Sequence, residues 1–280
     1  MQDWIFEKAC AKVNLALHVF GRRDDGYHEL DSIVAFADFG DELKLRHAAQ
    51  TSLKVAGPFA EWVPQGDDNI VFKALNVWHT ATAMPAPQVE IVLEKNLPVA
   101  SGLGGGSADA AAVLRGLQRL YQIELSETHL QSLAKSLGAD VPVCFSQRSC
   151  QMQGIGEIIR PLTILLPKAI VLVNPNVACS TQTVFSKLNF KMGETFELPV
   201  DIENPPSWRN DLAEAASMFV PQIETVLAAL EQEQCFSAVR LSGSGATCFG
   251  LCSSPAIAMA AAARLSVRNP NWWVKSASLL

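Results

Sequence analysis

The chain has 280 residues, a length that suits one large domain or two ordinary ones. Apolar residues make up 49% of the chain and charged residues 18%, and this balance excludes an intrinsically disordered protein. The 22 basic and 28 acidic side chains leave a formal charge of −6, which argues against a general attraction to nucleic acid or to anionic membranes. We therefore expect a soluble globular protein with no nucleic-acid partner and no membrane partner.

Seven cysteines are scattered along the chain, and no two of them form a CxxC pair. An odd number of scattered cysteines favours buried, reduced thiols over a disulfide framework or a structural zinc site. Near the start, Asp3, Glu7, Lys8 and Lys12 interrupt the apolar segment that a signal peptide requires. No apolar run approaches the roughly 18 residues of a membrane helix. These observations predict a cytoplasmic protein.

Strand-like and helix-like segments alternate in the first half of the chain. Segment length and β-branching predict strands over residues 13–20, 32–39, 41–46 and 89–93. A loop punctuated by glycines is expected over residues 21–30. Asp68 and Asn69 are candidate caps of a helix whose apolar face contains Val71, Leu75 and Trp78.

Two further helices are predicted before residue 140. The first has an apolar stripe at helical spacing, formed by Ala110, Val113, Leu114, Leu117, Leu120 and Tyr121. The second is expected over residues 126–137, with Ser126 as its cap and Gly138 as its stop. Later in the chain, the patterns predict strands over 169–174, 238–241 and 274–277 and helices over 221–232 and 255–265. The predicted fold class is therefore α/β (α+β), with one lobe at residues 1–160 and another at 161–280.

The densest local signal is a glycine-rich segment between a predicted strand and a predicted helix. Four of the five residues 102–106 are glycine. Glycine lets backbone N–H groups approach a ligand closely, and the start of a helix adds free N–H groups and the positive end of its dipole. The segment therefore suits an anion, most often a phosphate, and the alternative is a flexible turn before a helix.

The commoner phosphate-binding and hydrolase motifs do not match this segment. No Gly-Lys pair occurs in the chain, which excludes a Walker A loop. Ser107 stands where the dinucleotide pattern requires its third glycine, and the last position of the GxSxG motif is also missed. An HExxH zinc motif is absent as well.

Three segments instead resemble the signatures of the GHMP kinases, which include the galactokinases, homoserine kinases, mevalonate kinases and phosphomevalonate kinases. Residues 98–107, which read PVASGLGGGS, resemble the second signature. Residues 241–247 resemble the third signature and residues 11–15 the first, so all three occur in the correct order. One branch matches best, the 4-diphosphocytidyl-2-C-methyl-D-erythritol kinases. Residues 11–30 resemble the opening of that branch, and residues 138–142 another of its segments.

This resemblance implies a two-lobed GHMP kinase fold, with an N-terminal ATP-binding lobe and a catalytic cleft between the lobes. It implies transfer of the γ-phosphate of ATP, with Mg²⁺, to the 2-hydroxyl of 4-diphosphocytidyl-2-C-methyl-D-erythritol in the non-mevalonate isoprenoid pathway. The residues themselves identify no magnesium ligands. The implied ATP-binding residues are Pro98, Val99, Ala100, Ser101, Gly102, Leu103, Gly104, Gly105, Gly106, Ser107 and Ala108. Ser101 and Ala108 depart from the glycine and serine that are common in the branch.

Two catalytic residues are implied, Asp140 and Lys12. Asp140 would accept the proton of the acceptor alcohol, and Lys12 would keep this aspartate ionised and stabilise developing negative charge. From the residues alone, Asp140 reads equally well as an exposed turn residue or helix cap, and Lys12 as a solvated lysine on a strand edge. Asp109, in the first turn of the glycine-loop helix, is interpreted as an acid that complements the helix dipole.

The implied substrate-binding residues are Asn14, Tyr27, His28 and Phe185. Asn14 lies two residues after Lys12 and so on the same face of a strand. Tyr27 and Phe185 would lie on the two faces of the cytosine ring, and His28 at its edge. Core packing is the alternative for Phe185, and an exposed loop position is the alternative for His28.

Two other functions remain open from the sequence. Another GHMP kinase, acting on mevalonate or homoserine, would have no nucleobase for Tyr27, His28 and Phe185 to bind. A non-catalytic relative that only binds a ligand would not need the proton acceptor Asp140.

Overall fold

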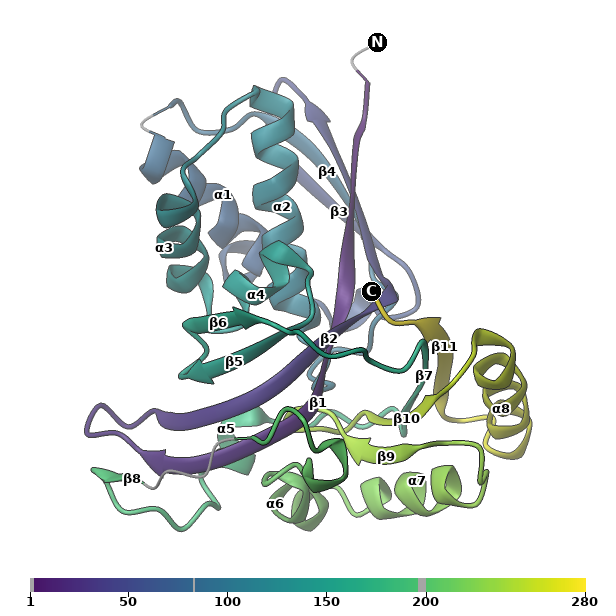
Figure 1. Ribbon diagram of the computed structural model, residues 1–280. Helices are drawn as coiled ribbons and strands as arrows, with labels where there is room; N and C mark the ends of the chain where they lie inside the picture. The colour runs from purple at the N-terminus through teal and green to yellow at the C-terminus, as the bar shows by residue number, and fades with distance from the viewer. Residues whose placement is uncertain (1–2, 83, 196–199) are drawn as a thin grey trace. The chain divides into compact units, whose positions relative to one another are not determined.

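The computed structural model describes residues 3–82, 84–195 and 200–280. Its strands are β1 Ile5–Arg22, β2 His28–His47, β3 Ser52–Ala56, β4 Val89–Glu94, β5 Cys150–Gly154, β6 Ile158–Pro161, β7 Ala169–Asn174, β8 Glu194–Thr195, β9 Ala238–Leu241, β10 Cys248–Cys252 and β11 Trp273–Ser278. Its helices are α1 Ile70–Thr82, α2 Gly105–Tyr121, α3 Glu127–Leu137, α4 Val141–Ser146, α5 Thr181–Phe185, α6 Ala213–Phe219, α7 Gln222–Glu231 and α8 Pro255–Arg268. Single 3₁₀ turns lie at Ala60–Trp62, Gly66–Asp68 and Pro205–Ser207. Figure 1 shows these elements.

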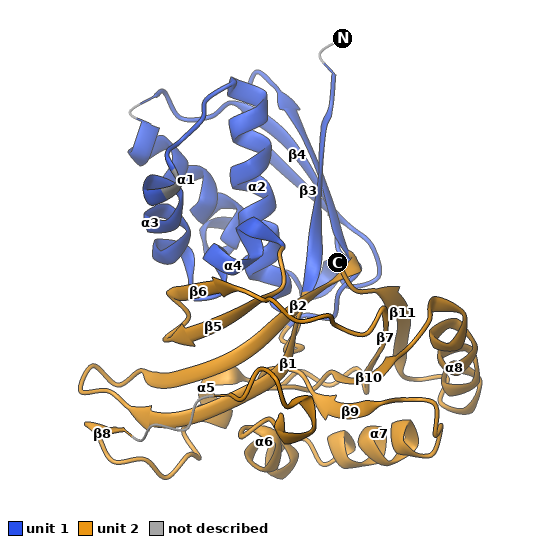
Figure 2. Cartoon of the chain, viewed as in Figure 1, with its two compact units in different colours: residues 1–11, 40–99, 104–147 blue, residues 12–39, 100–103, 148–280 orange. Residues whose placement is uncertain are grey.

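The chain divides into two compact units that alternate along the sequence (Figure 2). Unit 1 comprises residues 1–11, 40–99 and 104–147, and unit 2 comprises residues 12–39, 100–103 and 148–280. The long strands β1 and β2 each contribute residues to both units. The mixture of strands and helices confirms the predicted α+β class. The linear division at residue 160 stays a prediction.

Unit 1 consists of helices that pack beside a small mixed sheet. Residues 42–47 of β2 pair antiparallel with β4, and β3 pairs parallel with the other edge of β4. Helices α1, α2 and α3 lie side by side (Figure 1). Most of the predicted apolar faces are buried, with Val71, Leu75 and Trp78 on α1 and Ala110, Val113, Leu114 and Leu117 on α2. The last two residues of the predicted stripe, Leu120 and Tyr121, are half-buried.

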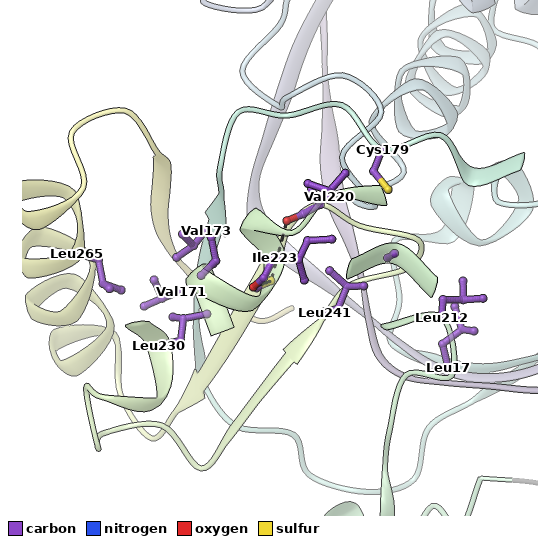
Figure 3. Packing of buried hydrophobic residues seen from close by; sticks show 14 of the residues in the cluster. Leu17, Val171, Val173, Cys179, Leu212, Val220, Ile223, Leu230, Leu241 and Leu265 are labelled. Carbon is purple, nitrogen blue, oxygen red and sulfur yellow. Dashed lines mark hydrogen bonds between the residues drawn. The ribbon is translucent and has the colours of Figure 1, made fainter. Parts of the chain in front are cut away.

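Unit 2 is built on an antiparallel sheet with the strand order β11-β7-β10-β9. Strand β7 is buried at every residue, and helix α8 packs against it and against β11. Helix α7 packs against β9 and β10. Val171, Val173, Ile223, Leu230 and Leu265 from these elements meet in one apolar core (Figure 3).

Most predicted elements are confirmed, although their lengths differ. The predicted strands 32–39 and 41–46 are one strand, β2, because Gly40 interrupts the sequence pattern without interrupting the extended backbone. Asn69 and Ser126 cap α1 and α3, since their side-chain oxygens accept the N–H groups of Val71 and His129. The short helices α4, α5 and α6 were not predicted. Among the described residues, no helix is long and apolar enough to cross a membrane.

Candidate active site

Three segments that lie far apart in the sequence are joined by hydrogen bonds within unit 2. The hydroxyl of Ser242 accepts the backbone N–H of Asn14 at 3.2 Å and donates to the carbonyl oxygen of Gly102 at 2.9 Å. The backbone N–H of Lys12 donates to the carbonyl oxygen of Leu103 at 2.9 Å. The backbone N–H of Thr247 donates to the carbonyl oxygen of Ser101 at 3.0 Å. Residues from all three predicted signatures are therefore held together.

Gly102 is required by this arrangement. Its φ is +79°, and a Cβ on it would lie 2.2 Å from the carbonyl oxygen of Ser242. Any other residue would suffer both an unfavourable backbone conformation and a steric clash. The glycine is therefore explained by packing against the second glycine-serine turn.

Lys12 and Asn14 are both buried. Lys12 is only 5% exposed, so it is not the solvated edge lysine of the alternative interpretation. Its charge lies near the thiol of Cys150 and lowers the pKa of that thiol, but burial is the larger effect and raises the pKa to about 12. Asn14 donates from Nδ2 to the hydroxyl of Ser32 at 2.7 Å, and its buried Oδ1 has no hydrogen-bond partner.

In unit 1, the N-terminus of α2 has no side-chain cap. The residue before the helix, Gly104, has left-handed backbone angles (φ 64°, ψ 22°) and has no side chain to accept a first-turn N–H group. The first N–H groups of a helix have no partner within the helix and attract anions. This geometry suits the phosphate site that the glycine segment predicts.

Next to Gly105, at the start of α2, lies a buried cluster of three charged side chains, which we call the Lys95 cluster. The Nζ atom of Lys95 lies 2.5 Å from Oδ2 of Asp41 and 2.5 Å from Oδ2 of Asp109. Burial raises the pKa of Asp109 to about 8, although Lys95 lowers it. Burial lowers the pKa of Lys95, but the attraction of Asp109 and Asp41 outweighs burial, so the net pKa is raised.

Asp140 occupies the N-cap position of α4, in unit 1. Its carboxylate makes no capping hydrogen bond to the helix, and Pro142 follows in the first turn. A capping aspartate normally accepts an N–H group of that turn. The position therefore matches the helix-cap alternative, but the side chain does not perform the capping role.

An aromatic group in unit 2 surrounds His28, the first residue of β2. The His28 ring lies 5.0 Å from the ring of Phe185 at an angle of 40°, and 6.2 Å from that of Phe190. The Nε2 atom of His28 is buried without a hydrogen-bond partner, and burial together with the charge of Arg22 lowers the pKa of His28. Tyr27, beside it, is 59% exposed. Phe185 also packs partly against the core of unit 2, as its alternative interpretation expects.

The family described as "GHMP kinases N terminal domain" matches residues 69–148, and that described as "GHMP kinases C terminal" matches residues 203–269. A 4-diphosphocytidyl-2-C-methyl-D-erythritol kinase from Paramagnetospirillum magneticum is 45% identical over 280 residues, which cover 98% of each chain. One from Agrobacterium fabrum is 44% identical over 95% of this chain and 93% of its own. The chain belongs to the 4-diphosphocytidyl-2-C-methyl-D-erythritol kinase family.

Solved structures agree with this membership. A crystal structure of 4-(cytidine 5′-diphospho)-2C-methyl-D-erythritol kinase is 33% identical, covers 98% of this chain and 99% of its own, and has a TM-score of 0.81. A homoserine kinase from Cytophaga hutchinsonii shares the fold, with a TM-score of 0.72 at 17% identity. The resemblance to the GHMP kinases and the predicted GHMP kinase fold are therefore both confirmed.

The predicted site residues of this family member fall into both units. Unit 2 contains Lys12, Asn14, Tyr27, His28 and Phe185 with residues 100–103, and unit 1 contains Asp140 with residues 98–99 and 104–108. Their roles stay predictions. Sequence reasoning missed Lys95 and Asp41, and it interpreted Asp109 only as an acid near a helix dipole. The sequence feature that could have indicated the cluster is a lone lysine, Lys95, directly after a buried strand. No nearby sequence pattern identifies its two carboxylate partners.

Proposed function

We propose that the chain transfers the γ-phosphate of ATP to the 2-hydroxyl of 4-diphosphocytidyl-2-C-methyl-D-erythritol, a step of the non-mevalonate isoprenoid pathway. Family membership supports the kinase activity, since relatives at 44–45% identity carry this name. The observation that carries the substrate assignment is the unsatisfied Nε2 atom of His28 beside the Phe185 ring. A buried polar atom without a partner is costly, and a ligand with a matching polar edge would remove that cost.

The cytidine end of the substrate fits this aromatic group. A cytosine ring has an apolar face for stacking and a polar edge for a directional hydrogen bond. Phe185 and the exposed Tyr27 would supply the stacking faces, and His28 would bind the edge. Because burial and Arg22 lower the pKa of His28, its ring is neutral near pH 7 and bears one donor and one acceptor nitrogen.

The glycine segment, residues 98–108, is the proposed ATP site. Gly104 leaves the start of α2 without a side-chain cap, so the first-turn N–H groups are available to the phosphates. Phosphoryl transfer depends mainly on positioning and on neutralising charge, which backbone N–H groups can provide.

Asp140 is the proposed proton acceptor for the 2-hydroxyl, and Lys12 is the proposed cation that stabilises the developing charge. The missing capping bond supports the role of Asp140, because a carboxylate that only ended a helix would cap it. The burial of Lys12 supports its role, because a buried ammonium exerts a stronger field than a solvated one.

Mg²⁺ is the proposed metal cofactor. Within the described ranges, no three His, Cys, Asp or Glu side chains are grouped so as to hold a metal ion. Mg²⁺ in kinases keeps several waters and is bound through substrate phosphates with few protein ligands, so the residues present fit a metal that enters with ATP. When bound, it would neutralise charge on the transferred phosphoryl group.

The proposed location is the cytoplasm. All seven cysteines lie in the described part of the chain and none forms a disulfide, as a reducing compartment requires.

A coupled assay of ADP release would test the proposed function. The purified chain would be given ATP, Mg²⁺ and one of three acceptors: 4-diphosphocytidyl-2-C-methyl-D-erythritol, mevalonate or homoserine. We expect turnover with the cytidine acceptor and at least a hundredfold lower kcat/KM with the other two acceptors, because they have no nucleobase to bind the aromatic group. A hundredfold difference corresponds to a loss of about 2.7 kcal/mol of interaction free energy. Equal turnover with mevalonate or homoserine would instead identify a different GHMP kinase. Absence of ADP release with every acceptor would favour a non-catalytic relative.

A further inference from the structure

We propose that Asp109 is a positioning residue that holds a proton when nucleotide binds, so that the Lys95 cluster next to Gly105 is neutral toward the nucleotide phosphates. The cluster contains one ammonium group and two carboxyl groups, and each of these side chains is at most 4% exposed. With both carboxylates ionised, it would carry one uncompensated negative charge inside the protein. An uncompensated buried charge is very costly, and a group in that situation normally takes up a proton instead.

The hydrogen bonds of the two carboxyl groups indicate which of them takes the proton. Oδ1 of Asp41 accepts the backbone N–H groups of Asn96 at 2.6 Å and Leu97 at 2.8 Å, in addition to the bond from Lys95 to Oδ2. Oδ1 of Asp109 is buried and has no partner. Donors stabilise an ionised carboxylate, and their absence favours the protonated form. Asp41 is therefore the ionised member of the cluster and Asp109 the protonated one.

Among the residues that the structure describes, no second cation shifts the pKa of Asp109. Within the described part of the chain, the charged groups that shift its pKa are Lys95, which follows β4, and Asp41 on β2. Desolvation and the nearby Asp41 carboxyl group raise the pKa of Asp109, Lys95 lowers it, and the net pKa is about 8. Helices α1 and α4, which pack against α2, bury apolar side chains and Cys144.

The position of the cluster connects its charge to the proposed ATP site, on which this inference rests. Asp109 lies in α2, two residues after Ser107 of the glycine segment. A Cβ on Gly105 would lie 3.3 Å from Nζ of Lys95 and 3.6 Å from Oδ2 of Asp41. Gly105, the first residue of α2, therefore lies directly against these groups. An unprotonated cluster would repel a polyphosphate bound by the glycine segment, whereas a protonated cluster would not.

Carboxyl-carbon NMR of the full chain would test for the proton directly. An aspartate resonance should titrate near pH 8 in the wild type and be absent from Asp109→Asn, which copies the neutral form. The thermal midpoint gives a second readout. The folded state binds one more proton than the unfolded state between about pH 4 and pH 8, so this site makes wild-type stability fall across that range. Asp109→Asn should lack that fall.

The matched control is Asp41→Asn, which removes the other carboxylate of the cluster. We expect this variant to be destabilised at every pH, because the Asn96 and Leu97 N–H groups lose a charged acceptor. If Asp41→Asn instead removed the titration near pH 8 while Asp109→Asn kept it, the assignment would be reversed. A wild type without any such titration, or an Asp109→Asn chain that cannot fold, would overturn the proposal.

The effect on nucleotide is measured as the ratio of ATP dissociation constants, wild type over Asp109→Asn, by calorimetry at pH 6.5 and pH 9. Taking the ratio cancels the ionisation of ATP itself. We expect this ratio to be about threefold or more higher at pH 9 than at pH 6.5. At pH 9 the wild-type cluster carries one added negative charge, whose repulsion of ATP costs about 0.7 kcal/mol or more at a moderate effective dielectric. An unchanged ratio would overturn the proposal. Absence of ATP binding by the wild type would reject the proposed function, and the NMR titration would still decide whether Asp109 is protonated.

Discussion

Ser242 donates its hydroxyl hydrogen to the carbonyl oxygen of Gly102 at 2.9 Å, although 140 positions separate the two residues in the sequence. The same hydroxyl accepts the N–H of Asn14, which is 228 positions away. One small side chain therefore connects the strand of Lys12, the glycine segment and the second glycine-serine turn. The residues that it joins, Asn14, Gly102 and Ser242 itself, all belong to unit 2.

Replacing Ser242 by alanine should destabilise the protein. The Asn14 N–H and the Gly102 carbonyl would lose their partner in a buried region, at a cost of about 1–3 kcal/mol in the free energy of unfolding. Urea unfolding measures this as a lower midpoint with an unchanged m-value. Ser186→Ala is the control, because this exposed hydroxyl bonds only within its own helix turn and should change stability by less than about 0.5 kcal/mol. Equal effects of the two substitutions would contradict the role of Ser242.

Asp140→Asn should lower kcat by about 10²- to 10⁴-fold, the usual contribution of a positioned proton acceptor. The affinity for ATP should change little, because the proposed role of Asp140 is at the acceptor hydroxyl and not at the nucleotide. Steady-state kinetics measure both quantities, and a thermal melt checks that the fold is retained. Asp68→Asn, at an exposed position before α1, is a matched control that should keep normal turnover. Near-normal kcat in Asp140→Asn would remove Asp140 from the catalytic role.

Gly105→Val should abolish ATP binding. The backbone conformation is not the obstacle, because the left-handed glycines here are Gly102 and Gly104 and not Gly105. The obstacle is the space beneath the residue, where a Cβ would lie 3.3 Å from Nζ of Lys95. A valine side chain would displace the Lys95 cluster and the loop. Calorimetry with ATP measures the loss, and unchanged affinity would show that the segment is only a turn.

Gly106→Ala is the control for stability at this helix start. The nearest atom to a Cβ at this position is 4.0 Å away, on Ile70, so the added methyl group fits. Alanine is also favoured over glycine inside a helix by about 0.8–1.0 kcal/mol. The thermal midpoint should therefore stay the same or rise in Gly106→Ala and fall in Gly105→Val. A fall in both would point to a general intolerance of side chains at the start of α2.

Alanine substitution of Tyr27, Phe185 or His28 should raise KM for the cytidine substrate and leave KM for ATP nearly constant. Base stacking on an aromatic ring contributes about 1–3 kcal/mol, which corresponds to roughly 5- to 150-fold in KM where KM approximates Kd. Phe185→Ala should also lower the thermal midpoint, since this ring packs partly against the core of unit 2, whereas the exposed Tyr27 should not. Trp62→Ala, at another exposed aromatic residue, is the control. If the three variants weakened ATP and the cytidine substrate equally, a different branch of the GHMP kinases would be indicated.

The sequence predicts an element best where local periodicity determines it. The stripe from Ala110 to Leu117 and the apolar run of β7 needed no tertiary information, and both are buried as expected. The helix α4 has six residues, too few to display a helical period, so the sequence left Asp140 open between a turn residue and a helix cap. The Lys95 cluster joins residues 54 and 14 positions apart in sequence. Such contacts depend on how β2, β4 and α2 pack, which no local pattern encodes.

The alternation of the two units along the chain has a consequence for cutting the protein into pieces. The chain passes from one unit to the other after residues 11, 39, 99, 103 and 147. A fragment that ends at residue 160 would contain Asn14 and Gly102 without the hydroxyl of Ser242 that both of them bond. It would also lack Thr247, whose N–H bonds the carbonyl of Ser101. Neither half of the gene would therefore encode a self-sufficient module, and insertions or circular permutations must respect five crossing points instead of one linker.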